Sequence, residues 1–207
     1  MKRAAALITI LWVAAVATLA GCSLGLQPRP DRSKFFLLSP TIAMPQSPPA
    51  GSTGLVIGLG PIKLPAYLER QEIVTRAAPN RMVLSGNNRW AEGLDGNFTQ
   101  VMAQDLAATL GTQRIVFFPW YQATMIDYQV RVDVYRFEGD LTGNVTLTAH
   151  WQILDGAGKL LYVTDSTFTA VAAAHGAAAV VAAMSSALGD LSRQIAAEIQ
   201  LLPTPPK

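Results

Sequence analysis

The chain has 207 residues, of which 50% are apolar and 14% charged, and it holds one cysteine and two histidines. This length is enough for one ordinary domain. One cysteine excludes an internal disulfide framework and a cysteine-rich zinc or iron–sulfur site, and two histidines leave little for metal or triad chemistry. Without Lys2 and Arg3, 14 basic side chains stand against 14 acidic ones. This neutral body argues against a nucleic-acid-binding protein, because neutralising phosphates needs cations clustered on one face.

The amino terminus has the pattern of an export signal. Two basic residues precede an apolar run over 4–20, which is shorter than the roughly 20 residues of a membrane-spanning helix. The run ends in Leu19-Ala20-Gly21-Cys22, which resembles the bacterial lipobox, where the cysteine is acylated and everything before it is removed. We therefore expect a removed signal peptide over 1–21, a lipid anchor at Cys22 and a tether over 22–33. The alternative is that Cys22 is a spare thiol.

The resemblance to lipoproteins also implies an address. Each buried methylene contributes about 0.8 kcal/mol, so one acyl chain holds a protein to a membrane weakly and two or more hold it stably. Lipoproteins of this kind carry three. Ser23 stands where the enterobacterial sorting pattern uses aspartate to keep a lipoprotein at the inner membrane. For a Gram-negative source, the resemblance therefore implies an outer-membrane anchor that faces the periplasm.

Two strands are predicted in the first part of the mature chain. Residues 34–39 form an apolar stretch between proline-rich segments, and the apolar run over 55–64 predicts a buried strand. Gly58-Leu59-Gly60 lies within this run but lacks the third glycine and the following helix of a phosphate-binding loop. We therefore do not expect a nucleotide site there.

A hairpin and a helix follow. Residues 73–77 and 82–85 flank Pro79-Asn80, which predicts a hairpin. Apolar residues recur at spacings of three and four over 92–110, which predicts a helix that ends at Gly111. A strand over 114–118 is then expected, ended by Pro119.

The next sixty residues predict three antiparallel strands. Apolar and polar residues alternate from Tyr128 to Val134, and then the phase shifts so that Tyr135 and Phe137 are the apolar members. A shift of one residue turns side chains to the other face unless a bulge intervenes, so we expect a bulge over 134–136. Alternation resumes over 145–153, and a turn over 155–158 leads into a third strand over 159–171.

A closing helix completes the expected fold. Apolar residues from Val180 to Ile199 step by three and four, which predicts a helix running to Leu201 that packs on the sheet; the alternative is a coiled-coil seam for a partner. The fold class is α/β in the broad sense (α+β): a single domain over 34–202 with a mixed, mostly antiparallel sheet and two helices packed on it. Residues 203–207 form a tail. Strand order is not predicted.

Few residues are candidates for catalysis or metal binding. His150 falls on the polar face of its strand and His175 at the start of the closing helix, and we expect surface or capping roles for both. A periplasmic hydrolase that uses either histidine is the enzyme alternative. Asp133, Glu138 and Asp140 are expected to be solvated, because their neighbours in sequence are not apolar enough to raise a pKa. We therefore expect no catalytic residue, no metal and no cofactor beyond the acyl group on the cysteine.

An aromatic cluster spans Phe117-Phe118-Pro119-Trp120-Tyr121. One interpretation is a core strand that runs into a proline turn. The other is an exposed rim that contacts lipid or a protein partner, because aromatic residues are enriched at such boundaries. Trp120 and Tyr121, which follow the proline, are the expected exposed pair.

Several segments together resemble the ABC-type transport auxiliary lipoprotein component family, also called the PqiC family. They are the lipobox, the Phe35-Phe36-Leu37-Leu38 stretch, Gly58 to Arg76 with its Leu64-Pro65-Ala66-Tyr67-Leu68-Glu69-Arg70 core, Arg89-Trp90-Ala91-Glu92, and the closing helix with Met184-Ser185-Ser186-Ala187-Leu188. Gly93 stands where the family pattern has proline, which bears only on the helix start.

This resemblance implies a non-enzymatic part of an MCE-type system that moves lipids between the inner and outer membranes. An MCE-domain protein would form the periplasmic conduit, and this lipoprotein would dock or stabilise its outer-membrane end, either alone or as a homo-oligomeric ring. An accessory lipoprotein of another outer-membrane assembly or secretion complex is the alternative.

Four further residues are candidates for partner binding: Tyr67, Arg70, Arg76 and Trp90. Their alternative roles are structural. Arg76, like Arg89, would bridge strands through carboxylates, whereas Tyr67 and Trp90 would fill the core near the hairpin.

Overall fold

The computed structural model describes residues 30–43, 54–120 and 125–203. The chain separates into two compact units, Met1–Arg32 and Ser33–Lys207, and every described helix and strand belongs to the second. The expected signal peptide, Cys22 and Tyr121 lie outside the described residues.

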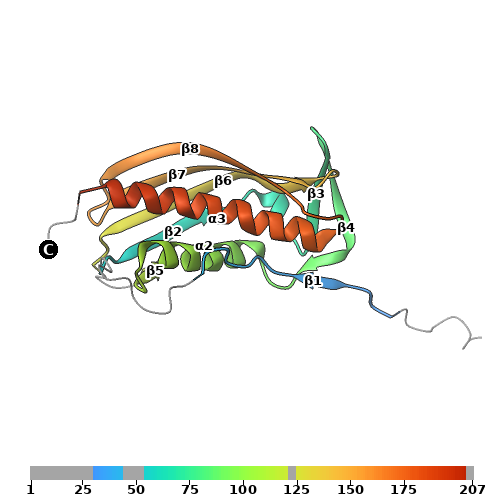
Figure 1. Ribbon diagram of the computed structural model, residues 1–207, viewed down its shortest axis with the longest axis horizontal. Helices are drawn as coiled ribbons and strands as arrows, with labels where there is room; N and C mark the ends of the chain where they lie inside the picture. The colour runs from blue at the N-terminus through green and yellow to red at the C-terminus, as the bar shows by residue number, and fades with distance from the viewer. Residues whose placement is uncertain (1–29, 44–53, 121–124, 204–207) are drawn as a thin grey trace, which may run out of the picture. The chain divides into compact units, whose positions relative to one another are not determined.

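Within those residues the fold is α+β, with two α-helices and an eight-stranded mixed sheet, as the sequence predicted (Figure 1). In chain order the elements are β1 (Lys34–Phe36), β2 (Ile57–Lys63), the 3-10 helix η2 (Ala66–Leu68), β3 (Glu72–Ala78), β4 (Arg81–Trp90), α2 (Leu94–Leu110), β5 (Ile115–Phe117), β6 (Tyr128–Asp140), β7 (Asn144–Asp155), β8 (Leu160–Val171) and α3 (Ala177–Leu201).

The long strand β6 organises the sheet. β7 pairs with it antiparallel along almost its whole length, and β8 pairs antiparallel with β7, which confirms the three-stranded prediction. On its other side β6 has two parallel partners in turn: β2 runs beside its first half, and β3 meets it at Gly139 and Asp140. β5 extends the β2 branch, and β4 and β1 extend the β3 branch.

The predicted bulge is present in β6. Its register with β7 shifts between Val134 and Arg136, and Tyr135 is the extra residue. Phe137 is fully buried and meets Phe98 of α2 edge to face, with ring centroids 5.3 Å apart, whereas Tyr135 is 58% exposed. The bulge therefore keeps the core face of β6 apolar on both sides of the phase shift.

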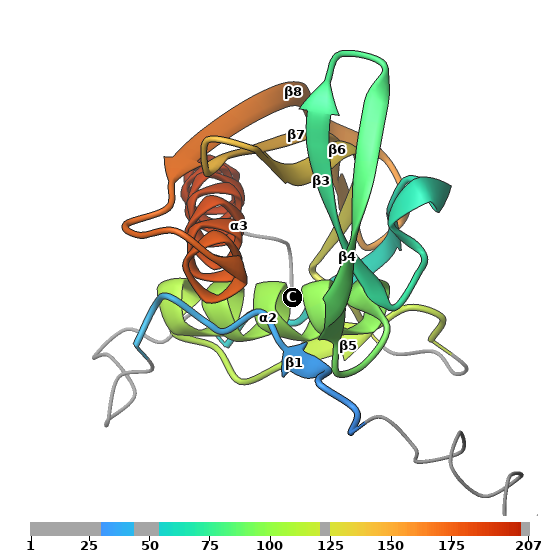
Figure 2. The same ribbon diagram turned by 90° about the vertical axis from the view of Figure 1, so that its right-hand side faces the viewer.

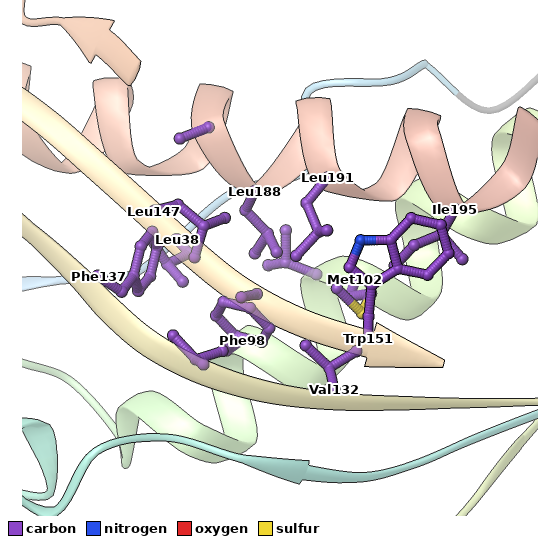
Figure 3. Close-up of a cluster of buried hydrophobic side chains, with 14 of the residues drawn as sticks. Leu38, Phe98, Met102, Val132, Phe137, Leu147, Trp151, Leu188, Leu191 and Ile195 are labelled. Atoms are coloured by element: carbon purple, nitrogen blue, oxygen red, sulfur yellow. The ribbon is translucent and has the colours of Figure 1, made fainter. Parts of the chain in front are cut away.

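Both helices cover one face of the sheet (Figure 2). α2 ends where the sequence predicted, because Gly111 adopts the left-handed conformation (φ 63°) that ends a helix without a side-chain penalty. Trp151, Leu191 and Ile195 meet between α3 and the sheet, and Phe98 and Met102 of α2 join the same cluster (Figure 3).

An extended segment over residues 37–42, here called the strap, crosses from β1 onto the helices. Leu38 donates its backbone N–H to Oδ1 of Asn97 at 2.6 Å, and Ser39 donates to Oγ of Ser185 at 3.1 Å. Thr41 and Ile42 both donate to Oδ1 of Asp105 at 3.1 Å. The strand predicted over 34–39 therefore ends at Phe36, because the next backbone donors bond to helix side chains instead of a neighbouring strand.

Candidate functional site

Two of the candidate residues, Tyr67 and Arg76, meet at a buried carboxylate. Glu138 of β6 is fully buried. The Tyr67 hydroxyl donates to its Oε2 at 2.6 Å, and Nε of Arg76 and Nε of Arg136 donate to its Oε1 at 2.6 and 2.8 Å. The backbone N–H of Phe137 also donates to Oε2. Four donors therefore surround one carboxylate, and together these side chains are called the Glu138 cluster.

The expectation that Glu138 is solvated was wrong. Glu138 shares its face of β6 with Arg136 and Asp140, whereas its apolar neighbour Phe137 points to the opposite face, so the alternation predicted a solvated carboxylate. The cover comes from η2, about 70 residues earlier in the chain, and from Arg76 of β3. Arg76 also donates to the carbonyl of Pro79, so one guanidinium holds both the carboxylate and the hairpin turn.

The cluster shifts the pKa of two of its members. Burial is the main cause that raises the pKa of Tyr67 to about 12, and its hydrogen bond to Glu138 adds to the rise. The pKa of Arg76 is raised, chiefly by its hydrogen bond to Glu138. Within the described residues, no buried side-chain polar atom of the cluster lacks a hydrogen-bond partner, so the arrangement fixes η2 on the sheet.

The other two candidates, Arg70 and Trp90, line one surface hollow of about 460 Å³. Residues 69–71, which follow η2, form one wall, and residues 90–95, which lead from β4 into α2, form the other. The backbone N–H of Trp90 donates to the carbonyl of Gln71 at 2.7 Å and joins the two walls. The two segments singled out in the sequence therefore meet in space.

The hollow has an apolar base and a charged rim. Trp90 is only 4% exposed and Leu94 is buried, whereas the side chain of Arg70 is exposed. Glu69, Glu92 and Asp95 also line it, so three carboxylates accompany one guanidinium. Of the four candidates, Arg70 alone is both exposed and part of the lining of the hollow. Trp90 fills the core, which is the structural role considered for it in the sequence analysis.

The residues of the aromatic cluster differ in exposure. Phe117 and Phe118 are 39% and 49% exposed, whereas Trp120, one of the expected exposed pair, is half-buried. The ring of Trp120 meets that of Phe118 edge to face, with centroids 5.3 Å apart. A Cβ on Gly58 would lie 2.9 Å from Cδ1 of Ile126 and 3.2 Å from the Trp120 ring, and one on Gly60 would lie 2.9 Å from Cβ of Phe118.

The two glycines of β2 therefore admit Ile126 and the aromatic side chains of Phe118 and Trp120, which cover this part of the sheet. Gly58 and Gly60 are two residues apart in β2, and a glycine inside a strand often marks a close approach by another group. This pattern in the sequence indicates that one face of β2 is closely covered, but it does not identify Trp120 as a covering residue.

The histidines are far from any catalytic arrangement. Nδ1 of His150 lies 3.0 Å from Oδ1 of Asp165, and its Nε2 lies 3.2 Å from Nε2 of Gln152. No serine or cysteine hydroxyl or thiol bonds to either ring nitrogen in the described structure. His175 lies beside a second, smaller hollow of about 220 Å³ at the start of α3. The described residues contain no cluster of histidine, cysteine and acidic side chains that could hold a metal ion.

The chain matches the model of the ABC-type transport auxiliary lipoprotein component family over residues 36–196. This match covers η2, the hollow and the Glu138 cluster. The chain belongs to that family.

Relatives agree with the assignment. The intermembrane transport lipoprotein PqiC of Escherichia coli (strain K12) is 24% identical over 161 residues, which cover 78% of each chain, and the protein of the same name from Shigella flexneri matches equally. These are proteins to which the chain is similar.

Two solved structures share the fold. A crystal structure of an uncharacterized protein superposes with a TM-score of 0.66 at 19% identity, covering 81% of this chain and 98% of the other. Protein XCC0632 from Xanthomonas campestris superposes with a TM-score of 0.64 at 16% identity, covering 80% and 95%. In the part of the chain that the structure describes, no helix combines the length and the apolar character needed to cross a membrane.

Proposed function

We propose that this auxiliary lipoprotein is anchored by acylated Cys22 to the periplasmic face of the outer membrane and acts, without catalysis, as a docking subunit of an MCE-type transport system that moves lipids between the two membranes. The observation that carries the proposal is the family match over residues 36–196, supported by relatives that are named intermembrane transport lipoproteins. The sequence Leu19-Ala20-Gly21-Cys22 supports the anchor.

The hollow lined by Arg70 is the surface we assign to the periplasmic partner. Its two walls, residues 69–71 and 90–95, overlap the segments by which the sequence resembles its family, and the hydrogen bond from Tyr67 to Glu138 holds η2, just before the first wall, on the sheet. A rigid hollow with an apolar base and a charged rim suits a protein contact, because such contacts combine a buried centre with a polar rim. Trp120, Tyr121 and the neighbouring exposed Phe117 and Phe118 form a second candidate contact, with lipid or with protein.

Site-directed cross-linking in intact cells tests the partner. A photoreactive residue in place of Arg70 should capture an MCE-domain protein, and the same residue in place of Gln200, which is exposed near the end of α3, is the matched control. If position 70 captures no such protein in cells that produce the transport system, the docking proposal is refuted.

Mass spectrometry of the native product tests the anchor. We expect a chain that begins at Cys22 and carries fatty acids, and a Cys22→Ser variant that leaves the membrane fraction. A native chain that begins elsewhere without acyl groups would refute the anchor but leave the partner test intact. The proposal includes the homo-oligomeric ring considered in the sequence analysis. The mass of the detergent-solubilised full chain tests it: we expect the mass of a closed oligomer, and the mass of a monomer would refute the ring alone.

A further inference from the structure

β8 forms an edge of the sheet over its whole length. It pairs with β7 from Asn144↔Val171 to Leu154↔Leu160, and no strand of the described residues lies along its other side. Its inner side chains are covered by α3; for example, Ser166 accepts a hydrogen bond from Trp151 Nε1 and donates one to Gln194 of α3. What stays open is the line of backbone groups along the outer edge.

The register determines which backbone groups these are. The β7–β8 pairing continues to Gly143 and Ala172, where the Ala172 N–H donates to the Gly143 carbonyl at 2.9 Å. Hydrogen-bonded pairs alternate along an antiparallel ladder, so the even-numbered residues of β8 from 162 to 170 direct their backbone groups to β7. The odd-numbered residues direct theirs to the free edge: Val163, Asp165, Thr167, Thr169 and Val171. Within the residues that the structure describes, the Asp165 carbonyl is the one group of this row with a hydrogen bond, which it accepts from the Thr164 hydroxyl at 3.4 Å.

This edge lacks the features that usually protect an edge strand. Soluble proteins protect edges by short strands, prolines, lysines or bulges. β5 and β1 fit this pattern because each has three residues, and Pro119 closely follows β5. β8 has twelve residues without proline, glycine, lysine or arginine, and its single charge is Asp165. Its one irregularity, opposite Ile153 and Leu154, lies at its start.

We propose that β8 pairs antiparallel with β8 of a second copy, about a twofold axis at Ser166. In this register residues 161–171 all find a partner, and opposite residues share one face of the joined sheet. The outward groups match as well, because Val163 meets Thr169 of the second copy, and Asp165 meets Thr167 of the second copy. Each such pair joins two odd-numbered residues, so each exchanges two backbone hydrogen bonds.

The side chains favour a second copy of this chain as the occupant. Asp165 lies opposite a threonine hydroxyl, which can donate to its carboxylate, and the two aspartates are kept off the axis, where they would repel. Val163 and Val171, which are 45% and 73% exposed, gain cover from the incoming strand. A pair of this kind uses the same surface twice and closes on itself, so a larger ring would need an additional interface. This proposal does not rest on the proposed function.

Paired cysteines in the full-length chain test the register in native membranes. In the Val163→Cys/Thr169→Cys variant, each cysteine lies opposite the other kind in the second copy, at a Cα separation of about 5.5 Å, which a disulfide spans. Mild oxidation should give a disulfide-linked dimer as the main species. Each single variant should give none, because residue 163 of one copy is about 20 Å along the strand from residue 163 of the other. The wild-type chain controls for Cys22.

Addition of a charge provides the second measurement. A second double-cysteine variant, Asp165→Cys/Thr167→Cys, leaves residue 169 available for substitution and should also give the dimer. Adding Thr169→Lys to this variant should abolish the dimer, since an edge lysine opposes strand pairing. Thr146→Lys is the matched control, because Thr146 lies opposite Thr169 on the same face of the sheet but one strand further in. In the same background this variant should leave the amount of dimer unchanged. Absence of a dimer in both double-cysteine variants, dimers from the single variants, or a cross-link to a different protein would each overturn the proposal.

Discussion

Tyr67 and Glu138 are 71 residues apart in the chain, and the Tyr67 hydroxyl donates a 2.6 Å hydrogen bond to the buried Glu138 carboxylate. This bond fixes η2, and with it one wall of the Arg70 hollow, on the sheet. Removal of the hydroxyl leaves one carboxylate oxygen with a single donor, the Phe137 N–H. The stability of the fold and the geometry of the hollow are therefore linked through one side chain.

Tyr67→Phe should lower the free energy of unfolding by about 1.5–3 kcal/mol, the range for a hydrogen bond to a charged group. The effect should also depend on pH. Burial and Glu138 raise the pKa of Tyr67 to about 12, from about 10 in an unfolded chain. The contribution of the protonated hydroxyl is therefore complete below pH 10 and is lost as the pH rises to 12. Denaturant titrations should show the wild-type protein losing more stability than the variant across that range; parallel losses would contradict the assignment.

Glu138→Gln should be more damaging, by about 2–4 kcal/mol. The change leaves Arg76 and Arg136 without their shared carboxylate, and breaking a buried ion pair from one side is costly, although both arginines keep some contact with water. Asp133→Asn is the matched control on the same strand. Its 3.5 Å pair with Lys63 is exposed, so a change below about 1 kcal/mol is expected. Equal losses in thermal or denaturant unfolding would argue that the Glu138 cluster is not buried.

Gly189→Ala tests how the strap is seated on α3. A Cβ at this position would overlap Oγ1 of Thr41 and lie 3.3 Å from its Cβ, so the Thr41 side chain or the strap must shift, and we expect a loss of about 1–3 kcal/mol. Gly96→Ala in α2 is the matched control, because its Cβ would meet nothing within 4 Å. Alanine favours an exposed helix position over glycine by about 0.8–1 kcal/mol, so this variant should be more stable than the wild-type protein. Similar stability changes of the same sign in both variants would contradict the contact.

Asp105→Asn tests the buried carboxylate that holds the strap. Burial is the main cause that raises the pKa of Asp105, against the lowering effect of the Ile42 and Thr41 N–H groups. Because the carboxyl group binds its proton more tightly in the folded than in the unfolded chain, it stabilises the fold below about pH 4. This stabilisation is lost as the pH rises through the raised pKa of Asp105. The stability of the variant relative to the wild-type protein should therefore increase from pH 4 to pH 7. Asp190→Asn, at an exposed pair with Arg193, is the matched control and should change the stability by less than about 1 kcal/mol.

Local patterns predicted much of this fold. The phase shift after Val134 located the β6 bulge, and Gly111 located the end of α2, because both depend on neighbours in sequence. The parallel pairings of β6 with β2 and β3 were not predicted, since they join segments about 65 to 70 residues apart.

Long-range contacts also explain what was missed at the site. Glu138 alternates with polar Arg136 and Asp140 on its face of β6, and its burial depends on Tyr67 and Arg76, which arrive from other elements. The half-buried position of Trp120 depends on the side-chain-free surface at Gly58. In both cases the decisive neighbour lies more than 60 residues away.

The strap has a mechanical consequence. β1 runs parallel to β4, with Lys34 beside Asn88 and Phe36 beside Trp90, and the next residues bond to Asn97, Ser185 and Asp105. A pull applied to the chain ahead of β1 would load these bonds together in shear, not one after another as in unzipping. Tension on the amino-terminal side would therefore reach both helices as well as the β1–β4 edge of the sheet.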